Sequence, residues 1–342
     1  MISRRRAVIF CLAVLTGVIA GALAAGPAAQ STSGDAAAVL SATRQVLGGE
    51  KRLSSIKTIV ASGQTRQLQG DNLVPILFEI SIELPDKYVR IDEIPARESG
   101  PSRRGFNGDG LIQSEDAPGA MARRGGPPPG PAGAPTRGPG AADIAADKGA
   151  PSGPPPNPTL PVRQDFARLT LGMFATSFSA YPLSFGHAGQ AEAPEGRADV
   201  LDVKGAGNFA ARLFIDSKTH LPLMLSWTTP PNLVPVVAGK KPPATLPPGS
   251  VTFETPMPPA ESASAEEKKA FEDEALALRK KAMASARPTE HRIYYADYRD
   301  VDGLQLPFRV RRAVGATTVE ETVFDRYRIN ARVDPRKFEA RE

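Results

Sequence analysis

The closing third of the chain constrains the fold most, because it contains three β-type runs joined by tight turns. The first run enters an Asp302-Gly303 dipeptide, which is among the strongest short-range indicators of a β-hairpin. A second run follows at 308–312 and a third at 317–329, and a hairpin of the same style occupies 214–223. Strands that follow one another through short turns pair antiparallel, so these segments predict one large antiparallel sheet.

Two amphipathic patterns predict helices beside this sheet. Apolar residues at helical spacing run from 35 to 47, and Gly48-Gly49 supplies the stop. A second helix is expected to start at Pro161 and to end at Tyr181-Pro182, with one broad apolar stripe. Because the strands are consecutive and do not alternate with helices, the pattern excludes a doubly wound sheet. It predicts an α+β, mainly β fold of about nine or ten strands. The expected architecture is a curved antiparallel sheet forming a half-open barrel, with helices lidding or filling the concave face.

The strands at 76–84 and 221–229 show the period of two that is typical of a sheet with one buried and one wetter face. The residues expected on the buried faces are Ile76, Phe78, Ile80, Ile82 and Leu84 in the first strand and Leu221, Leu223, Leu225 and Trp227 in the second.

Two long segments have compositions that argue against a place in the core. Segment 117–161 is rich in Gly and Pro, and such a stretch cannot bury enough apolar area to offset the entropy of ordering it. Segment 230–290 begins Pro-rich and continues into a helix with a capping box, Ser264 followed by Glu267. We therefore expect one domain over 31–342, interrupted by a disordered insert at 117–161 and a Pro-rich and helical insert at 230–290.

The N-terminus has the features of a secretory signal peptide over residues 1–25. Arg4-Arg5-Arg6 precedes an uncharged apolar run, and Ala22-Leu23-Ala24 offers a small-residue cleavage site. This predicts a periplasmic protein, and an uncleaved membrane anchor is the alternative because the run approaches spanning length. Cys11, the only cysteine, lies in this run, so the mature chain would have no disulfides, thiolate metal sites or cysteine nucleophile.

The net charge of +5 includes the three leader arginines, so the rest of the chain is nearly balanced. No ordered element combines clustered cations with interleaved aromatics, which argues against a nucleic-acid partner. A mild attraction to an anionic membrane surface, with transient contact, is compatible with this charge.

Signatures of catalysis and of cofactor binding are missing from the sequence. His187, His220 and His291 are scattered, and we expect exposed structural roles for His220 and His291. The acidic series at 297–302 fits a hairpin better than a calcium loop. We therefore predict no cofactor, no metal and no catalytic residue. A hydrolase built around His187, with Asp199 or Asp202 nearby, is a weaker alternative.

The apolar stripe of the helix expected after Pro161 has two interpretations. It is an ordinary core helix, or it covers a concave sheet and accepts acyl chains, each buried methylene contributing about 0.8 kcal/mol. The candidate ligand-binding residues under the second interpretation are Phe78, Ile80, Ile82, Phe166, Leu169, Met173, Phe174, Leu223, Leu225 and Trp227.

The chain resembles the LolA/LolB-like superfamily of periplasmic outer-membrane lipoprotein-sorting proteins. The likeness is carried by the leader and by Leu47-Gly48-Gly49, Leu84-Pro85-Asp86-Lys87-Tyr88, Gly105-Phe106-Asn107-Gly108-Asp109, Thr219-His220-Leu221-Pro222, 298–307, Tyr327-Arg328-Ile329-Asn330 and Val333-Asp334-Pro335. The resemblance implies a half-open antiparallel barrel capped by helices, with a hydrophobic cavity for lipid chains. No position matches the arginine with which sorting carriers hold their lid, and Arg90 is a candidate only by lying on a central strand.

These observations predict a periplasmic, non-catalytic carrier for acyl chains, lipids or lipoproteins, whose partner is a lipid or an acylated protein. The alternative is an envelope scaffold or protein-interaction module that acts through the Pro-rich inserts.

Overall fold

The computed structural model describes residues 33–70, 72–95, 100–114, 157–193 and 196–339. The predicted signal peptide at 1–25 and most of the 117–161 segment lie outside these residues. All elements below belong to one unit, Ser31–Glu342. No helix among the described residues is long and apolar enough to cross a membrane.

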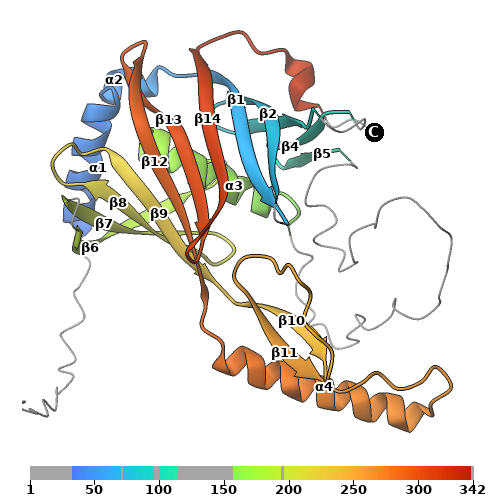
Figure 1. Ribbon diagram of the computed structural model, residues 1–342. Helices are drawn as coiled ribbons and strands as arrows, with labels where there is room; N and C mark the ends of the chain where they lie inside the picture. Colours follow the sequence, from blue (N-terminus) through green and yellow to red (C-terminus); the bar gives the residue numbers. More distant parts are fainter. Residues whose placement is uncertain (1–32, 71, 96–99, 115–156, 194–195, 340–342) are drawn as a thin grey trace, which may run out of the picture. The chain divides into compact units, whose positions relative to one another are not determined.

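Twelve of the strands form one sheet, which Figure 1 shows with its central strands toward the viewer. In chain order these strands are β1 (Thr58–Gln69), β2 (Asn72–Glu83), β3 (Lys87–Glu93), β4 (Ser102–Asn107), β5 (Gly110–Gln113), β6 (Leu183–Ala193), β7 (Gly196–Gly205), β8 (Phe209–Asp216), β9 (Pro222–Thr229), β12 (Thr289–Val301), β13 (Leu304–Val314) and β14 (Thr317–Ile329). Their order is β5-β4-β3-β2-β1-β14-β13-β12-β9-β8-β7-β6, and neighbours pair antiparallel.

The order shows that two meanders meet in the middle of the sheet. The first runs from β1 to β5 and the second from β6 to β14, and the pairing of β1 with β14 joins them. Strands β5 and β6 remain at opposite edges, so the sheet is not closed into a barrel. The predicted fold class, a curved and open antiparallel sheet with helices, is confirmed, although it has more strands than the nine or ten expected.

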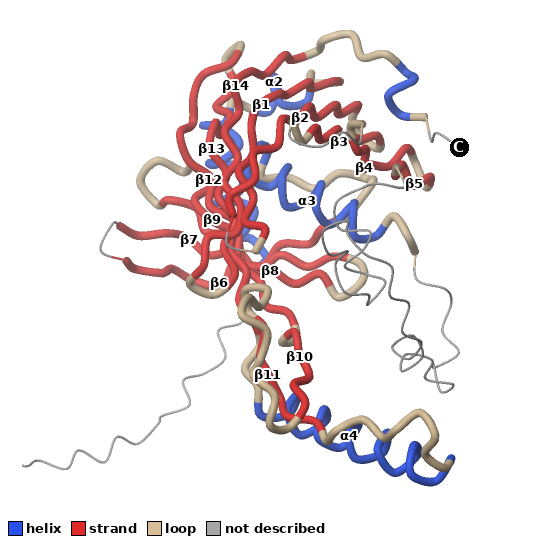
Figure 2. Tube along the Cα trace, turned by 45° about the vertical axis from the view of Figure 1, so that its right-hand side comes forward, coloured by secondary structure: helices blue, strands red, loops and turns tan. Residues whose placement is uncertain are grey.

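Two helices cover one face of this sheet (Figure 2). Helix α1 (Ser33–Leu47), followed by the short α2 (Glu50–Ser54), contacts β6 and β13, and α3 (Leu160–Phe174) contacts β4, β9 and β13. The predicted helix at 35–47 corresponds to α1. Helix α3 ends earlier than expected, because Ala175 adopts a left-handed conformation (φ 46°) and its N–H bonds back to the carbonyl of Leu171.

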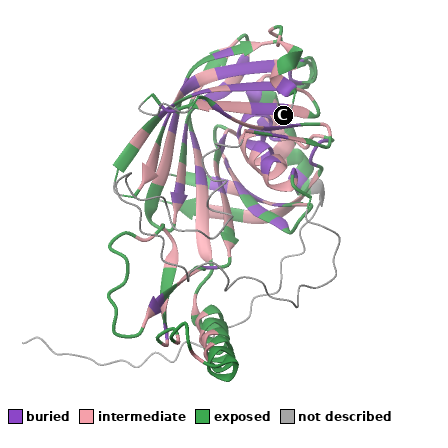
Figure 3. Ribbon diagram, turned by 90° about the vertical axis from the view of Figure 1, so that its right-hand side faces the viewer, coloured by how far each residue is buried: buried purple, intermediate pink, exposed green. Residues whose placement is uncertain are grey.

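Buried residues of the sheet and of these helices form one core cluster, and Figure 3 colours the buried residues purple. The alternation predicted for the strand at 76–84 is confirmed for Phe78, Ile80 and Ile82, which are buried in β2 while Leu77 is exposed, but it is wrong for Ser81, which is 1% exposed. The shared face predicted at 221–229 is wrong for Leu223, which is 39% exposed. The register between β8 and β9 shifts there, with Ile215 opposite Pro222 and Phe214 opposite Met224, so Leu223 is the extra residue of a bulge.

Residues 230–288 form a separate excursion between β9 and β12. Strands β10 (Asn232–Val237) and β11 (Ser250–Thr255) pair parallel, and α4 (Ala265–Ser285) contacts both. The predicted capping box is confirmed, because Ser264 and Glu267 bond reciprocally at the start of α4. No residue of α4 is buried.

Candidate ligand-binding site

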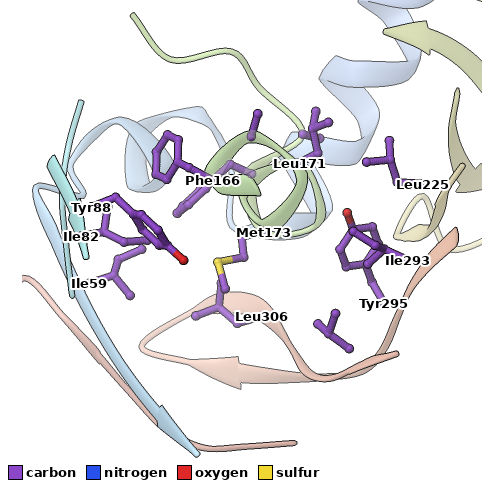
Figure 4. Packing of buried hydrophobic residues seen from close by; sticks show 14 of the residues in the cluster. Ile59, Ile82, Tyr88, Phe166, Leu171, Met173, Leu225, Ile293, Tyr295 and Leu306 are labelled. Atoms are coloured by element: carbon purple, nitrogen blue, oxygen red, sulfur yellow. The ribbon is translucent and has the colours of Figure 1, made fainter. Parts of the chain in front are cut away.

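Helix α3 is packed on most of its circumference. Its buried residues are Val162, Phe166, Ala167, Thr170, Leu171, Gly172, Met173 and Phe174. The ring of Phe166 lies 5.6 Å from that of Tyr88 and 5.4 Å from that of Phe106. Figure 4 shows α3 side chains pointing toward residues on different sides of the helix, such as Tyr88 and Leu306. Because its buried residues run from Val162 to Phe174, α3 is a core element along most of its length.

Tyrosines of β12 fix this helix in place. The hydroxyl of Tyr295 donates to the carbonyl of Arg168, and that of Tyr298 donates to the carbonyls of Gly172 (2.8 Å) and Pro222 (3.0 Å). Gly172 lies so close to the Tyr295 ring that an added Cβ would come within 2.3 Å of it. This close approach explains why the position is a glycine.

Most of the residues predicted to bind ligand lie in the filled core. Those with 4% exposure or less are Phe78, Ile80, Ile82, Phe166, Met173, Phe174 and Leu225. Leu169 and Trp227 are partly buried against the same core, and Leu223 is exposed away from it. The structure thus brings nine of these residues together in one core, and two of them, Ile80 and Leu169, also line a cavity.

That cavity lies between the first half of α3 and the strands β1, β2, β3, β4, β13 and β14, and has a volume of about 170 Å³. Its lining residues are Thr65, Gln67, Ile76, Ile80, Tyr88, Arg90, Asp92, Ser102, Arg104, Val162, Asp165, Leu169, Val310, Arg312, Glu320, Thr322 and Phe324. It is smaller than the roughly 300–1,000 Å³ typical of small-molecule pockets. The apolar part of this lining is Ile76, Ile80, Val162, Leu169, Val310 and Phe324, and most of the other residues are polar or charged.

The charged lining comprises three arginines and three carboxylates. The Arg90 guanidinium donates to Asp92 (2.7 Å) and to the Thr65 hydroxyl (3.0 Å), both on the sheet, and lies over the Phe78 ring. Arg90 therefore bonds to strands and not to α3. Burial raises the pKa of Tyr88 to about 12, so the Tyr88 hydroxyl keeps its proton at neutral pH.

The other two arginines have looser partners. Arg104 lies 3.4 Å from Asp165 of α3, and Arg312 lies 3.8 Å from Glu320 of β14. Asp165 also accepts a hydrogen bond from Arg168 at 2.9 Å. Our sequence interpretation missed this cationic lining. The alternation in β3 could have indicated it, since Tyr88, Arg90 and Asp92 occupy the face opposite Val89 and Ile91.

A stack of three side chains ties α3 to the neighbouring strands. The Arg168 guanidinium lies 4.5 Å from the Trp227 ring, and the His291 imidazole stacks on Trp227 at 5.2 Å and 11°. The His291 Nε2 is 2.9 Å from the Thr229 hydroxyl oxygen. The expectation of an exposed His291 is therefore wrong, because the cross-strand pairing with Trp227 covers its ring.

The described residues give little support to hydrolase or metal chemistry. Asp199 accepts a bond from Gln190, and Asp202 pairs with Arg212, so both acids considered for His187 have other partners. Asp300 accepts a bond from the Gly303 N–H in the hairpin turn, as the hairpin interpretation requires. Within the described ranges, no three His, Cys, Asp or Glu side chains gather into a metal-binding group.

Comparisons with known proteins find no matching family model and no matching curated protein. Among solved structures, an outer membrane lipoprotein-sorting protein domain from Vibrio parahaemolyticus matches with a TM-score of 0.40 and 7% identity, over 90% of this chain and 97% of that chain. A LolA superfamily protein from Nitrosomonas europaea matches with a TM-score of 0.40 and 11% identity, over 88% and 96%. The arrangement of the chain is similar to that of these two proteins.

A DUF1329 family protein from Desulfovibrio piger also matches, with a TM-score of 0.37 and 6% identity over 89% of this chain and 97% of that chain. At these identities and TM-scores the likeness concerns the arrangement of the chain. It carries no argument about ligand or activity.

Proposed function

We propose that the protein is a non-catalytic carrier that binds an amphiphile, a lipid or an acylated protein, in the cavity between the sheet and the first half of α3. The observation that carries this proposal is the mixed character of the cavity lining. Apolar side chains such as Ile76, Ile80, Leu169 and Val310 line the same space as three arginines and three carboxylates. An amphiphile likewise combines an apolar chain with a polar headgroup.

The size of the cavity sets how much of such a ligand it holds. A volume of about 170 Å³ suits one part of an amphiphile, not a whole acyl chain. Helix α3 is held by Tyr295 and Tyr298, and by Arg163, which donates to the Gly108 carbonyl, so the rest of the ligand would lie outside the cavity. Each methylene that enters the apolar part contributes about 0.8 kcal/mol.

The proposal includes export to the periplasm and transient contact with a membrane surface. Its support is the leader-like sequence of residues 1–25, with its arginines, apolar run and small-residue exit. A carrier that moves amphiphiles between membranes has to meet a membrane at each end of its path.

The test is native mass spectrometry of the protein isolated without detergent, followed by solvent extraction. We expect a discrete added mass that extracts as a lipid. Leu169→Glu places a carboxylate in the apolar part of the cavity lining and should abolish this added lipid mass. Leu223→Glu is the matched control, because it makes the same change at an exposed bulge position, and should retain the ligand.

Circular dichroism of both variants checks that the strands remain formed. A bare polypeptide mass in the wild type, unchanged after incubation with phospholipids and acylated peptides, would rule the carrier out. Retention of lipid by folded Leu169→Glu would place the ligand elsewhere.

A further inference from the structure

The cavity contains a pair of like charges that the sheet register places side by side. Arg90 of β3 and Arg104 of β4 are direct cross-strand partners, and both line the cavity. Like charges directly opposite each other destabilise an antiparallel pair, and no turn or strand geometry requires arginine there. Arg312 of β13 lines the same cavity. Three cations thus converge on one space of about 170 Å³.

The three arginines differ in how far the protein already satisfies them. A guanidinium has five N–H donors. Arg90 places two of its donors on Asp92 and Thr65. The side chains of Arg104 and Arg312 form no hydrogen bond with another residue in the described ranges, and their carboxylate neighbours stand at 3.4 and 3.8 Å. Donors of these two arginines therefore remain available to a ligand.

The neighbouring carboxylates are themselves engaged elsewhere. Asp165 accepts from Arg168 at 2.9 Å, and Glu320 accepts from the Thr322 hydroxyl at 3.3 Å. Neither carboxylate has to lose its whole hydrogen-bonding environment when a ligand approaches the arginine beside it. The long Arg104–Asp165 and Arg312–Glu320 contacts can then yield to shorter, charge-assisted bonds to an anion.

Exposure gives the site an orientation. The Arg104 and Arg312 side chains are 41% and 33% exposed, whereas Ile80 and Phe324 of the lining are 2% exposed. The two loosely paired arginines are thus accessible to water, while Ile80 and Phe324 are buried, as are the polar Thr65 and Thr322 of the same lining. An amphiphile that enters the cavity chain first would leave its headgroup beside the arginines.

We infer that Arg104 and Arg312 form a headgroup site for the phosphate or carboxylate of an anionic amphiphile. The inference rests on the proposed carrier function and names the chemical class of its cargo. Arginine suits this task because its planar fork matches phosphate and carboxylate oxygens in a bidentate way. Arg90, tied to Asp92 and Thr65, supplies positive charge behind the site.

The test is isothermal titration calorimetry of the purified full chain with three probes: short-chain phosphatidylglycerol, short-chain phosphatidylcholine and inorganic phosphate. We expect phosphatidylglycerol to bind more tightly than phosphatidylcholine in the wild type. Arg104→Gln and Arg312→Gln should each weaken phosphatidylglycerol binding by roughly 10- to 100-fold, the loss expected for hydrogen bonds to a charged group. Phosphatidylcholine binding should change little.

Arg212→Gln is the matched control, because Arg212 is also an arginine in a loose ion pair, 3.2 Å from Asp202, but lies outside the cavity. It should bind both lipids as the wild type does. Arg312→Lys keeps the charge and loses the bidentate fork, so it should fall between the wild type and Arg312→Gln. It also provides a second variant if the glutamine variant does not fold.

The outcomes separate the two proposals. Equal affinity of the folded wild type for both lipids would overturn the headgroup site and leave the carrier standing. Failure of the wild type to bind either lipid would overturn the carrier, and with it the lipid headgroup. Binding of inorganic phosphate alone, lost in Arg104→Gln, would identify a free anion as the ligand and overturn the amphiphile.

Discussion

At the scale of single residues, specific side-chain contacts hold α3 against the sheet in addition to its apolar packing. Arg168 lies over Trp227, and Trp227 stacks on His291. Burial, and then the positive charges of Arg168 and Arg312, hold the pKa of His291 below its ordinary value. A neutral imidazole is therefore part of the contact between the helix and the sheet.

This arrangement predicts a loss of stability on acidification. The pKa of His291 is lower in the folded chain than in the unfolded one, so the unfolded chain takes up the proton first as the pH falls. The contribution of neutral His291 to the free energy of unfolding is complete above a pH of about 6.5 and is lost progressively below it. The melting temperature should fall between pH 7.5 and pH 5.5.

His291→Phe keeps an aromatic ring against Trp227 and removes the titration. Its melting temperature should fall less than that of the wild type over the same interval, measured by differential scanning calorimetry. Parallel pH profiles of the two proteins would mean that other groups cause the change.

Gly172 carries a second residue-scale prediction. Alanine there should destabilise the protein by about 1–3 kcal/mol, the usual cost of overpacking, although alanine favours helices more than glycine does. The reason is that the new Cβ would lie within 2.3 Å of the Tyr295 ring, which the hydroxyl bond to Arg168 holds in place. Urea unfolding gives the free-energy difference.

A Tyr295→Val background provides the control, because it removes the ring that the Cβ would meet. The same glycine change should cost less there, or even stabilise the helix. An equal cost in both backgrounds would assign the effect to the backbone of α3.

At the scale of elements, local chemistry predicted much of the structure. The capping box of α4 and the Asp302-Gly303 hairpin depend only on neighbours in sequence, and both are present; the alternation in β2 is present except at Ser81, which is buried. The end of α3 at Phe174 and the bulge at Leu223 could not be predicted in this way. Ala175 and Leu223 have no side-chain feature that marks a left-handed residue or an extra residue in a strand.

The excursion at 230–288 should be removable. Thr229 and Thr289 are direct partners in the β9–β12 pair, so an Asn-Gly dipeptide between them would form a two-residue hairpin. We expect the shortened chain to fold with a melting temperature close to that of the wild type, and to keep its bound lipid. Circular dichroism and native mass spectrometry provide the two measurements.

A chain in which a ten-residue Gly-Ser linker replaces the same segment controls for strain in the tight turn. If both shortened chains fold but no longer carry lipid, the binding site lies in the excursion. Loss of a protein partner, with lipid retained, would favour the scaffold function for the Pro-rich segment.

At the scale of the whole molecule, the site was harder to predict than the fold. The predicted apolar residues do come together, but chiefly as a filled core, because alternation identifies buried positions and not empty ones. The cavity draws its lining from six strands and α3, which are far apart in sequence. Only the register of the assembled sheet places Arg90 opposite Arg104, with Arg312 in the same cavity lining.

The junction of β1 with β14 determines when the protein can fold during its own synthesis. Ile59 pairs with Ile329, and the Asn330 carboxamide oxygen accepts from the Lys57 N–H, so the centre of the sheet joins segments from opposite ends of the chain. Such distant pairing is slow, because a long loop has to close first. A ribosome that has not yet released the last strand holds two half-sheets whose inner edges are unpaired. Each half-sheet can pair within itself, but the centre of the sheet closes only after β14 has been made.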